Sequence, residues 1–213
     1  MEDRVTLRFC DELEHGFGWI VDEFLARCSH ALVVDGRVWV IDPVDGPDVI
    51  ERIRAAGDPA GVIQLLDRHN RDSRALADRL DVPLHVVPRK AIEGAPFEFL
   101  VVRKGWTWKE VALWWPGPRI LVVADALGTV GYFVAPGERL GVHPLLRLIP
   151  PRRRLGGVDP ETVLCGHGEG VLHGAGAPFR EALRTSRRRL PAALRSAVRS
   201  RRQVSTGSSG KSS

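Results

Sequence analysis

Three short apolar runs in this sequence each lead into an aspartate or a histidine. The runs are residues 61–67, 120–124 and 162–165, and the polar residues at their ends are Asp67, His69, Asp125 and His167. Short aliphatic runs between Gly, Pro and polar residues predict buried strands. Polar residues that follow strands in α/β proteins commonly gather at one sheet edge, where sites form. The pattern therefore predicts an α/β or α+β fold with a site at that edge.

The segments around these runs predict the remaining elements. Residues 31–42 predict a hairpin, because two β-branched runs flank Asp35-Gly36, a pair that suits a type I′ turn. Helical patterns cover residues 48–57 and 72–80. Further strands are predicted over 82–88 and, as an antiparallel meander, over 97–127.

The length of 213 residues fits one domain with a tail. We expect the domain to span residues 1–203, with its core over 31–185 and a basic C-terminal helix over about 178–203, interrupted at Pro191. The Ser/Gly-rich residues 204–213 predict a disordered tail. No apolar run is long enough for a membrane span, and the acidic start lacks the apolar region of a secretory signal.

The three cysteines, Cys10, Cys28 and Cys165, are odd in number and form no C-x-x-C motif. We expect reduced thiols and a cytoplasmic protein. Positive charge is concentrated near the C-terminus, where residues 141–213 hold 14 Lys and Arg against 4 Asp and Glu. Such a segment can contact nucleic acid. No aromatic residues interleave with these arginines, so we expect a solvated helix face rather than a nucleic-acid partner.

Five segments together resemble the metallo-β-lactamase superfamily. They are SHALVVDGRVWVIDPV (29–44), IQLLDRHNRDSRALADRL (63–80), KGWTWKEVALWW (104–115), ILVVADAL (120–127) and VLCGHGEG (163–170). They correspond, in order, to the family's opening hairpin, its H-x-H-x-D-H loop and helix, its G-H-T segment, the strand with its metal-bridging Asp, and its closing G-H-G. The resemblance implies a four-layer αββα sandwich with the site at one edge of the sheets.

The metal-binding motif departs from the family pattern. Where the family has H-x-H-x-D-H, this chain has Asp67, His69, Arg71 and Asp72, and Trp106 replaces the His of G-H-T. Asp125 and His167 keep the family's residues. Arg71 is permanently charged and has no acceptor. At about 4 Å it would repel a divalent ion by roughly 8 kcal/mol in an effective dielectric of about 20. We therefore expect at most one metal ion.

The resemblance implies a metal-assisted hydrolase of a small ester, thioester, amide or phosphoester. Its ion would be Zn, Fe or Mn, held by Asp67, His69, Asp125 and His167, with Asp72 as a further candidate ligand or as the N-cap of the following helix. Arg71 and Asp125 would be the catalytic residues, with Arg71 orienting an anionic group. The substrate would be a small molecule.

The main alternative is a metal-free pseudoenzyme or binding module with a protein partner. Arg71 would then take the place of the metal charge among Asp67, Asp72 and Asp125. Trp106 is a candidate substrate-binding residue if it lies exposed at the mouth of the site. We expect His143, in a proline-limited loop, to lie at the surface. A third possibility is nucleic-acid binding through the basic C-terminal segment.

Overall fold

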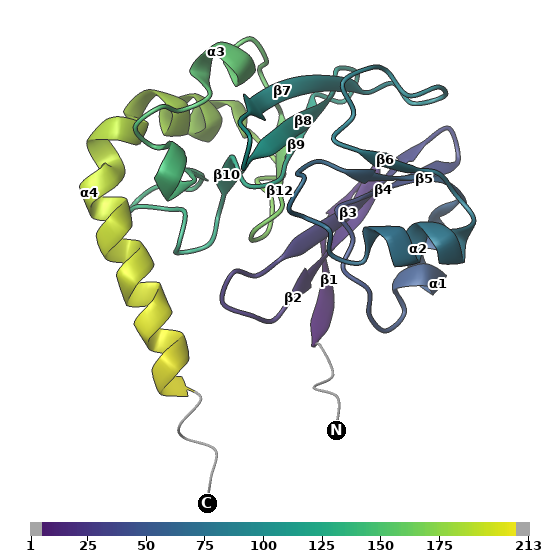
Figure 1. Ribbon diagram of the computed structural model, residues 1–213, viewed down its shortest axis with the longest axis horizontal. Coiled ribbons are helices and arrows are strands. Elements are labelled where there is room, and N and C mark those ends of the chain that lie inside the picture. The colour runs from purple at the N-terminus through teal and green to yellow at the C-terminus, as the bar shows by residue number, and fades with distance from the viewer. Residues whose placement is uncertain (1–5, 208–213) are drawn as a thin grey trace, which may run out of the picture.

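The N-terminal part of the chain forms a six-stranded mixed sheet in the computed structural model, which describes residues 6–207 (Figure 1). Its strands lie in chain order: β1 (Leu7–Leu13), β2 (Gly16–Val21), β3 (Cys28–Val34), β4 (Arg37–Ile41), β5 (Asp58–Gln64) and β6 (Leu84–Val86). Strands β1 to β4 pair antiparallel, and β4, β5 and β6 pair parallel. The parallel pairs need crossovers, which helices α1 (Val49–Ala56) and α2 (Ser73–Leu80) supply.

The predicted hairpin and both predicted helices of this layer are confirmed, whereas strands β1 and β2 were not predicted and two strands, β5 and β6, are shorter than expected. Asp35 and Gly36 have φ angles of 49° and 76° and form the turn between β3 and β4. Strand β5 ends at Gln64, whereas we expected it to reach Asp67. The Leu65 N–H donates to the Asp42 side chain (2.9 Å), and the Leu65 carbonyl accepts from Val111 (2.9 Å). Residues 65–67 therefore leave the first sheet and join the second.

The second sheet has four strands in the order β12 (Thr162–Cys165), β9 (Ile120–Val123), β8 (Lys109–Trp115) and β7 (Glu98–Lys104). Strands β7, β8 and β9 form the predicted antiparallel meander, and β12 pairs parallel with β9. The connection between β9 and β12 contains the short elements β10 (Leu127–Gly128), β11 (Gly141–Val142), η1 (Pro144–Leu146) and α3 (Arg152–Leu155).

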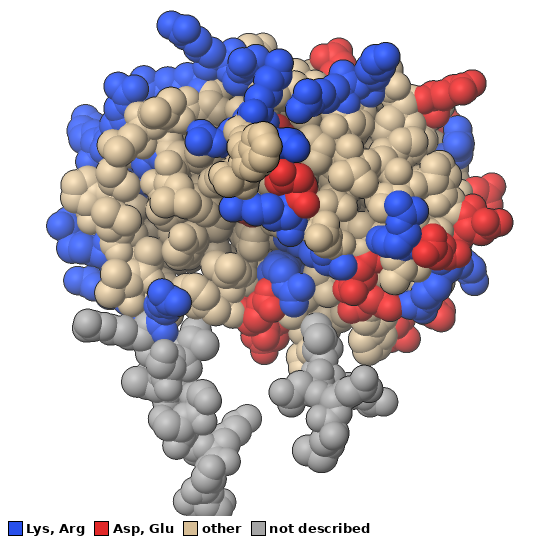
Figure 2. Space-filling model, in the orientation of Figure 1, with Lys and Arg blue, Asp and Glu red and all other residues tan. Residues whose placement is uncertain are grey.

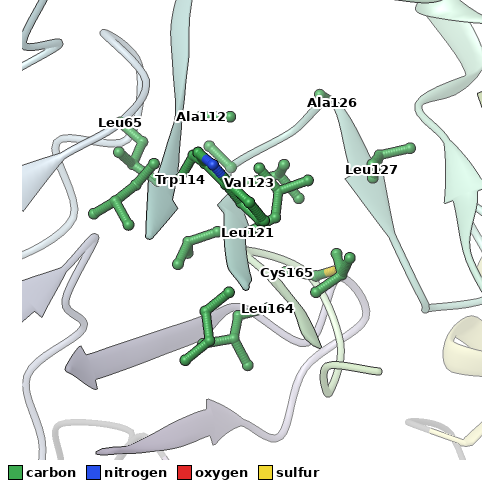
Figure 3. Packing of buried hydrophobic residues seen from close by; sticks show 14 of the residues in the cluster. Leu65, Ala112, Trp114, Leu121, Val123, Ala126, Leu127, Leu164 and Cys165 are labelled. Atoms are coloured by element: carbon green, nitrogen blue, oxygen red, sulfur yellow. The ribbon is translucent and has the colours of Figure 1, made fainter. Parts of the chain in front are cut away.

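Helices cover the outer sides of the two packed sheets. The core between the sheets includes Leu65 next to β5, Leu121 of β9 and Leu164 of β12 (Figure 3). A separate cluster packs α1 and α2 against the other face of the six-stranded sheet. The first turns of α4 (Gly176–Gly207) add Phe179 and Leu183 to the core on the opposite side. The expected four-layer αββα order is confirmed.

Helix α4 continues through Pro191, so the prediction that Pro191 interrupts it is wrong. Proline removes one hydrogen bond and displaces the preceding turn, which bends a helix without ending it when neighbouring turns are held. The bend is visible in Figure 1. Residues 204–207, which we expected in the tail, belong to this helix, and the rest of the expected tail, 208–213, lies outside the described residues. Among the described helices, none is long and apolar enough to cross a membrane.

Candidate functional site

Three of the predicted site residues meet at one point between the two sheets. His69 follows β5, Asp125 follows β9 and His167 follows β12. The Nε2 atom of His69 lies 2.9 Å from Asp125 Oδ1, and the Nε2 atom of His167 lies 3.0 Å from the same oxygen. The ligand atoms of all three lie within 4.8 Å of one another. The parallel strands β4–β5 and β9–β12 bring these ends together, as the sequence pattern indicated.

The outer nitrogen of each imidazole is held by an acceptor. His167 Nδ1 lies 2.9 Å from the Leu25 carbonyl, and His69 Nδ1 lies 3.2 Å from Asp42 Oδ2. A carbonyl can only accept, so the His167 proton belongs on Nδ1. His69 stands between two carboxylates, and a neutral ring with its proton on Nδ1, toward Asp42, leaves Nε2 free to bind a cation. Neutral rings in these tautomers turn Nε2 lone pairs toward Asp125. Three acceptor atoms then face one another with no proton between them. Only a bound cation or added protons can turn this repulsion into attraction.

The surroundings keep Asp125 ionised. Burial acts to raise the pKa of its carboxyl, but when no cation is bound, hydrogen bonds from the protonated Nε2 atoms of His167 and His69 outweigh burial and hold the pKa well below its usual range. Burial and the charge of Arg71 act to lower the pKa of His69. Its contacts with Asp125 and Asp42 prevail, and the pKa is raised. The site therefore carries a stable negative charge beside two imidazoles.

The pseudoenzyme alternative predicts that Arg71 pairs with the carboxylates of Asp67, Asp72 and Asp125. Its guanidinium instead bonds to backbone carbonyls. Its Nη1 donates to the carbonyls of Cys28 (2.7 Å) and Asp42 (2.9 Å), and its Nη2 donates to the carbonyl of Gly166 (2.9 Å). These carbonyls belong to β3, to the end of β4 and to the loop before His167. The guanidinium therefore ties the first sheet to the loop of the second.

Three other predicted site residues do not join the group. An Asp67 carboxylate oxygen accepts from the Lys109 backbone N–H (3.2 Å). Asp72 accepts from the Asp45 N–H (2.8 Å) and makes no side-chain cap to α2, although it directly precedes that helix. The side chain of Trp106, in the turn between β7 and β8, is 94% exposed.

A pocket of about 350 Å³ opens onto Asp125 and His167. Its apolar wall includes Tyr132 and Phe133, from the connection between β9 and β12, and Phe133 stacks on His167 with ring centroids 5.5 Å apart. His143 also lines the pocket and is 8% exposed, so its expected surface position is wrong. The aromatic rings that surround His143 bury it. No periodicity in residues 128–160 signals this wall.

Glu110 accepts a hydrogen bond from the backbone N–H of Asp125, and the sequence analysis did not identify this residue. It is fully buried, and its Oε1 accepts from the backbone N–H groups of Asp125 (3.0 Å) and Ala126 (2.8 Å). Its Oε2 accepts from the Trp108 indole (2.7 Å). Burial, followed by the charge of Asp125, raises the pKa of Glu110 to about 7. The Arg68 guanidinium stacks on Trp108 (4.5 Å) and reaches within 3.6 Å of Asp125 Oδ2.

The pocket histidine should make folding stability depend on pH. Burial lowers the pKa of His143 to about 4, with Asp125 opposing and His167 and Arg68 reinforcing the shift. The unfolded chain takes up this proton at about pH 6.5, so the stability is present above that pH and is lost as the pH falls toward 4. Between pH 7 and pH 5 the wild type should lose about 2 kcal/mol more than His143→Gln.

Urea denaturation of both proteins at the two pH values measures this difference. His173→Gln serves as the control, because His173 is exposed. It should lose as much stability as the wild type. Equal losses in the wild type and His143→Gln would contradict the assignment of this pH dependence to His143.

No family model matches the chain, and no curated protein matches its sequence. Solved structures do match. DIM-1 metallo-β-lactamase exposed to ceftazidime is 14% identical over 90% of this chain and 99% of that chain, with a TM-score of 0.56. The metallo-β-lactamase from Erythrobacter litoralis is 13% identical over 90% and 94%, with a TM-score of 0.58. A fragment of diflavin flavoprotein A 5 from Nostoc sp. PCC 7120 is 12% identical over 86% and 98%, with a TM-score of 0.60.

Identities this low establish the architecture and leave the activity open. With its two packed sheets, its covering helices and the site at their edge, the chain has the metallo-β-lactamase fold.

Proposed function

We propose that this protein is a hydrolase that uses one divalent metal ion held by His69, Asp125 and His167. The observation that carries the proposal is the convergence of two Nε2 atoms on one carboxylate oxygen, while acceptors hold both Nδ1 atoms. This donor set fits Zn, Fe or Mn. Such an ion, when bound, supplies a water of lowered pKa for attack on an ester, thioester, amide or phosphoester.

The side chains around the three ligands suggest how a small substrate would be held. The apolar wall with Tyr132 and Phe133 would receive an apolar group of the substrate and keep water from it. The Arg68 guanidinium lies 3.6 Å from Asp125 Oδ2, and its side chain is 48% exposed. We therefore assign it the binding of an anionic or carbonyl oxygen, a role that we first expected of Arg71. The bonds of Arg71 to three carbonyls favour a structural role instead.

Ion content tests the proposal. The wild type and the double variant His69→Ala/His167→Ala, purified without chelator and reconstituted with Zn, Fe or Mn, would be compared by inductively coupled plasma mass spectrometry. The double variant should hold one ion fewer per chain and lose hydrolysis of model esters and phosphoesters. His85→Ala/His173→Ala is the matched control, because it removes two histidines outside the group.

Two results would contradict the proposal. Equal ion content in the wild type and in the folded His69→Ala/His167→Ala variant would mean that these histidines hold no ion. The non-catalytic binding module would then be favoured, with Asp125 bonded directly to two protonated imidazoles. Hydrolysis that survives the double substitution would separate the activity from this site.

Two of the arginines near the C-terminus make hydrogen bonds within the fold. Lys and Arg gather over α3 and α4, at the top and left of Figure 2, while most of the Asp and Glu on this face lie elsewhere. Arg152 donates to the carbonyls of Leu183 and Arg184, and Arg187 donates to that of Leu148. These bonds connect α4 to the segment that forms the pocket wall. They favour a structural role for these two arginines, in addition to the solvated helix face that we expected, over a nucleic-acid site.

We also propose a cytoplasmic location. All three cysteines are free and buried, which suits a reducing compartment.

A further inference from the structure

A second cluster of metal-ligating side chains lies in the six-stranded sheet, outside the site described above. It consists of Cys10, Asp11, Cys28 and His30, each at most 7% exposed. The Sγ atoms of Cys10 and Cys28 lie 3.7 Å apart. Cys28 Sγ lies 3.7 Å from Asp11 Oδ2 and 3.5 Å from His30 Nε2, and the last two atoms lie 3.0 Å apart. The ligand atoms of Cys10, Asp11 and Cys28 all lie within 4.8 Å of one another, while the His30 ring adjoins Asp11 and Cys28 but lies farther from Cys10.

The sheet is built to bring these side chains together across an intervening strand. Cys10 is on β1 and Cys28 and His30 are on β3, while β2 places Gly18 opposite both Cys10 and His30. A Cβ at Gly18 would lie 3.0 Å from the His30 ring and 3.2 Å from Asp11 Cβ, so a side chain there would crowd the cluster. Asp11 has a φ of 50° at a register shift in β1. Such an irregularity lets two successive side chains, Cys10 and Asp11, enter the same space.

A disulfide does not explain the two cysteines. They lie on strands separated by a third, hence about 9.5 Å apart in the sheet. Cα atoms joined by a disulfide lie within about 7 Å. Two thiolates bound about 2.3 Å from a tetrahedral ion stand about 3.7 Å apart, which matches the observed sulfur separation.

We propose that Cys10, Asp11 and Cys28 bind a zinc ion, with the His30 ring holding the Asp11 carboxylate (3.0 Å). Thiolate is a ligand that zinc prefers, a carboxylate oxygen also binds zinc, and a hydrogen-bonded neighbour such as His30 commonly orients a ligating side chain. Binding releases the two thiol protons to solvent. The ion with two thiolates and one carboxylate carries a charge of about −1. The guanidinium of Arg71, which donates to the Cys28 carbonyl (2.7 Å), supplies a compensating positive charge.

This zinc site would brace the loop that carries His167. Both carboxylate oxygens of Asp11 accept from the Gly170 N–H (2.9 and 3.0 Å), and the Cys28 N–H donates to the Gly166 carbonyl (2.9 Å). The two glycines flank His167 in the sequence. Loss of this ion should therefore loosen the loop of the candidate active site without removing any of its ligands.

Cobalt substitution tests the zinc site in the full-length protein. Cobalt bound to thiolates gives an intense charge-transfer absorption in the near ultraviolet, which imidazole and carboxylate ligands alone do not give. The wild type loaded with Co²⁺ should show this absorption, and Cys10→Ser/Cys28→Ser should lose it together with one zinc ion per chain. Cys165→Ser is the matched control, because Cys165 is buried outside the cluster, and it should keep both.

The same measurement separates this proposal from the hydrolase proposal. His69→Ala/His167→Ala should keep the thiolate absorption, because its cysteines are intact. If Cys10→Ser/Cys28→Ser fails to fold, the wild type still decides the question through the absorption itself and through the reactivity of its thiols. A chelator should expose two thiols to a disulfide reagent. Absence of the absorption in Co²⁺-loaded wild type, or thiol reactivity unchanged by the chelator, would overturn the zinc site.

Discussion

Replacing Arg71 by methionine should lower the free energy of unfolding by at least about 3 kcal/mol. Methionine keeps much of the buried side-chain volume but removes the donors that reach the carbonyls of Cys28, Asp42 and Gly166. A hydrogen bond from a charged donor contributes about 1.5–3 kcal/mol, and three such bonds are lost although the Asp42 and Gly166 carbonyls keep their bonds from the Ser29 hydroxyl and the Cys28 N–H. Because these carbonyls come from three separate segments, the loss should also loosen the junction of the two sheets.

Urea denaturation of Arg71→Met, Arg71→Lys and the wild type would measure this effect. Lysine should recover only part of the loss, since one ammonium group cannot reproduce the fork of a guanidinium. Arg74→Ala is the control, because Arg74 is an exposed arginine on α2. It should change stability by less than about 0.5 kcal/mol. A similarly small change in Arg71→Met would show that the three carbonyl bonds contribute little.

Replacing Glu138 by alanine should cost about 3–5 kcal/mol, because it leaves the buried charge of Arg147 unpaired. The Arg147 side chain is fully buried and Glu138 is 2% exposed, and the pair is joined by contacts of 2.6 and 3.1 Å. Arg147 also donates to the carbonyl of Phe133 (2.6 Å). Since Phe133 stacks on His167, the loss of this pair should disturb the pocket as well as the fold.

A double substitution identifies the cause of this loss. Glu138→Leu/Arg147→Met removes both charges, and it should recover part of the stability that Glu138→Ala loses. Glu181→Ala is the control, because its ion pair with Arg189 is longer (3.6 Å) and Glu181 is half-exposed. It should cost less than about 1 kcal/mol. If the double variant were no more stable than Glu138→Ala, an unpaired buried charge would not be the reason for the loss.

The sequence predicts the features that depend on short-range patterns. The turn at Asp35-Gly36, the two crossover helices and the meander each have a local signal, since apolar periodicity and turn residues lie within a few positions of one another. His69, Asp125 and His167 could be identified because each lies in the loop that follows a strand. Parallel pairing then places the ends of these strands together.

The features that the sequence does not predict depend on contacts between distant segments. Nothing near Arg71 indicates that its partners are the carbonyls of Cys28, Asp42 and Gly166, up to 95 residues away. Backbone acceptors leave no trace in the side-chain pattern. The cluster of Cys10, Asp11 and Cys28 forms only with the observed strand register and the irregularity at Asp11. No local sequence pattern signals either feature. The pocket wall with His143 lies in a segment without periodicity.

The separation of the site residues along the chain has a consequence for folding kinetics. His69 and Asp125 are 56 residues apart, and Asp125 and His167 are 42 apart. Strand β12 must cross over the whole 124–161 connection before it pairs with β9. Contacts of such high contact order form slowly, because loop closure costs entropy before any pairing compensates it. Synthesis places β12 last among the described strands, so the three side chains can meet only after both sheets have been synthesised. Occupancy of the site would therefore report that the two sheets have formed and packed together.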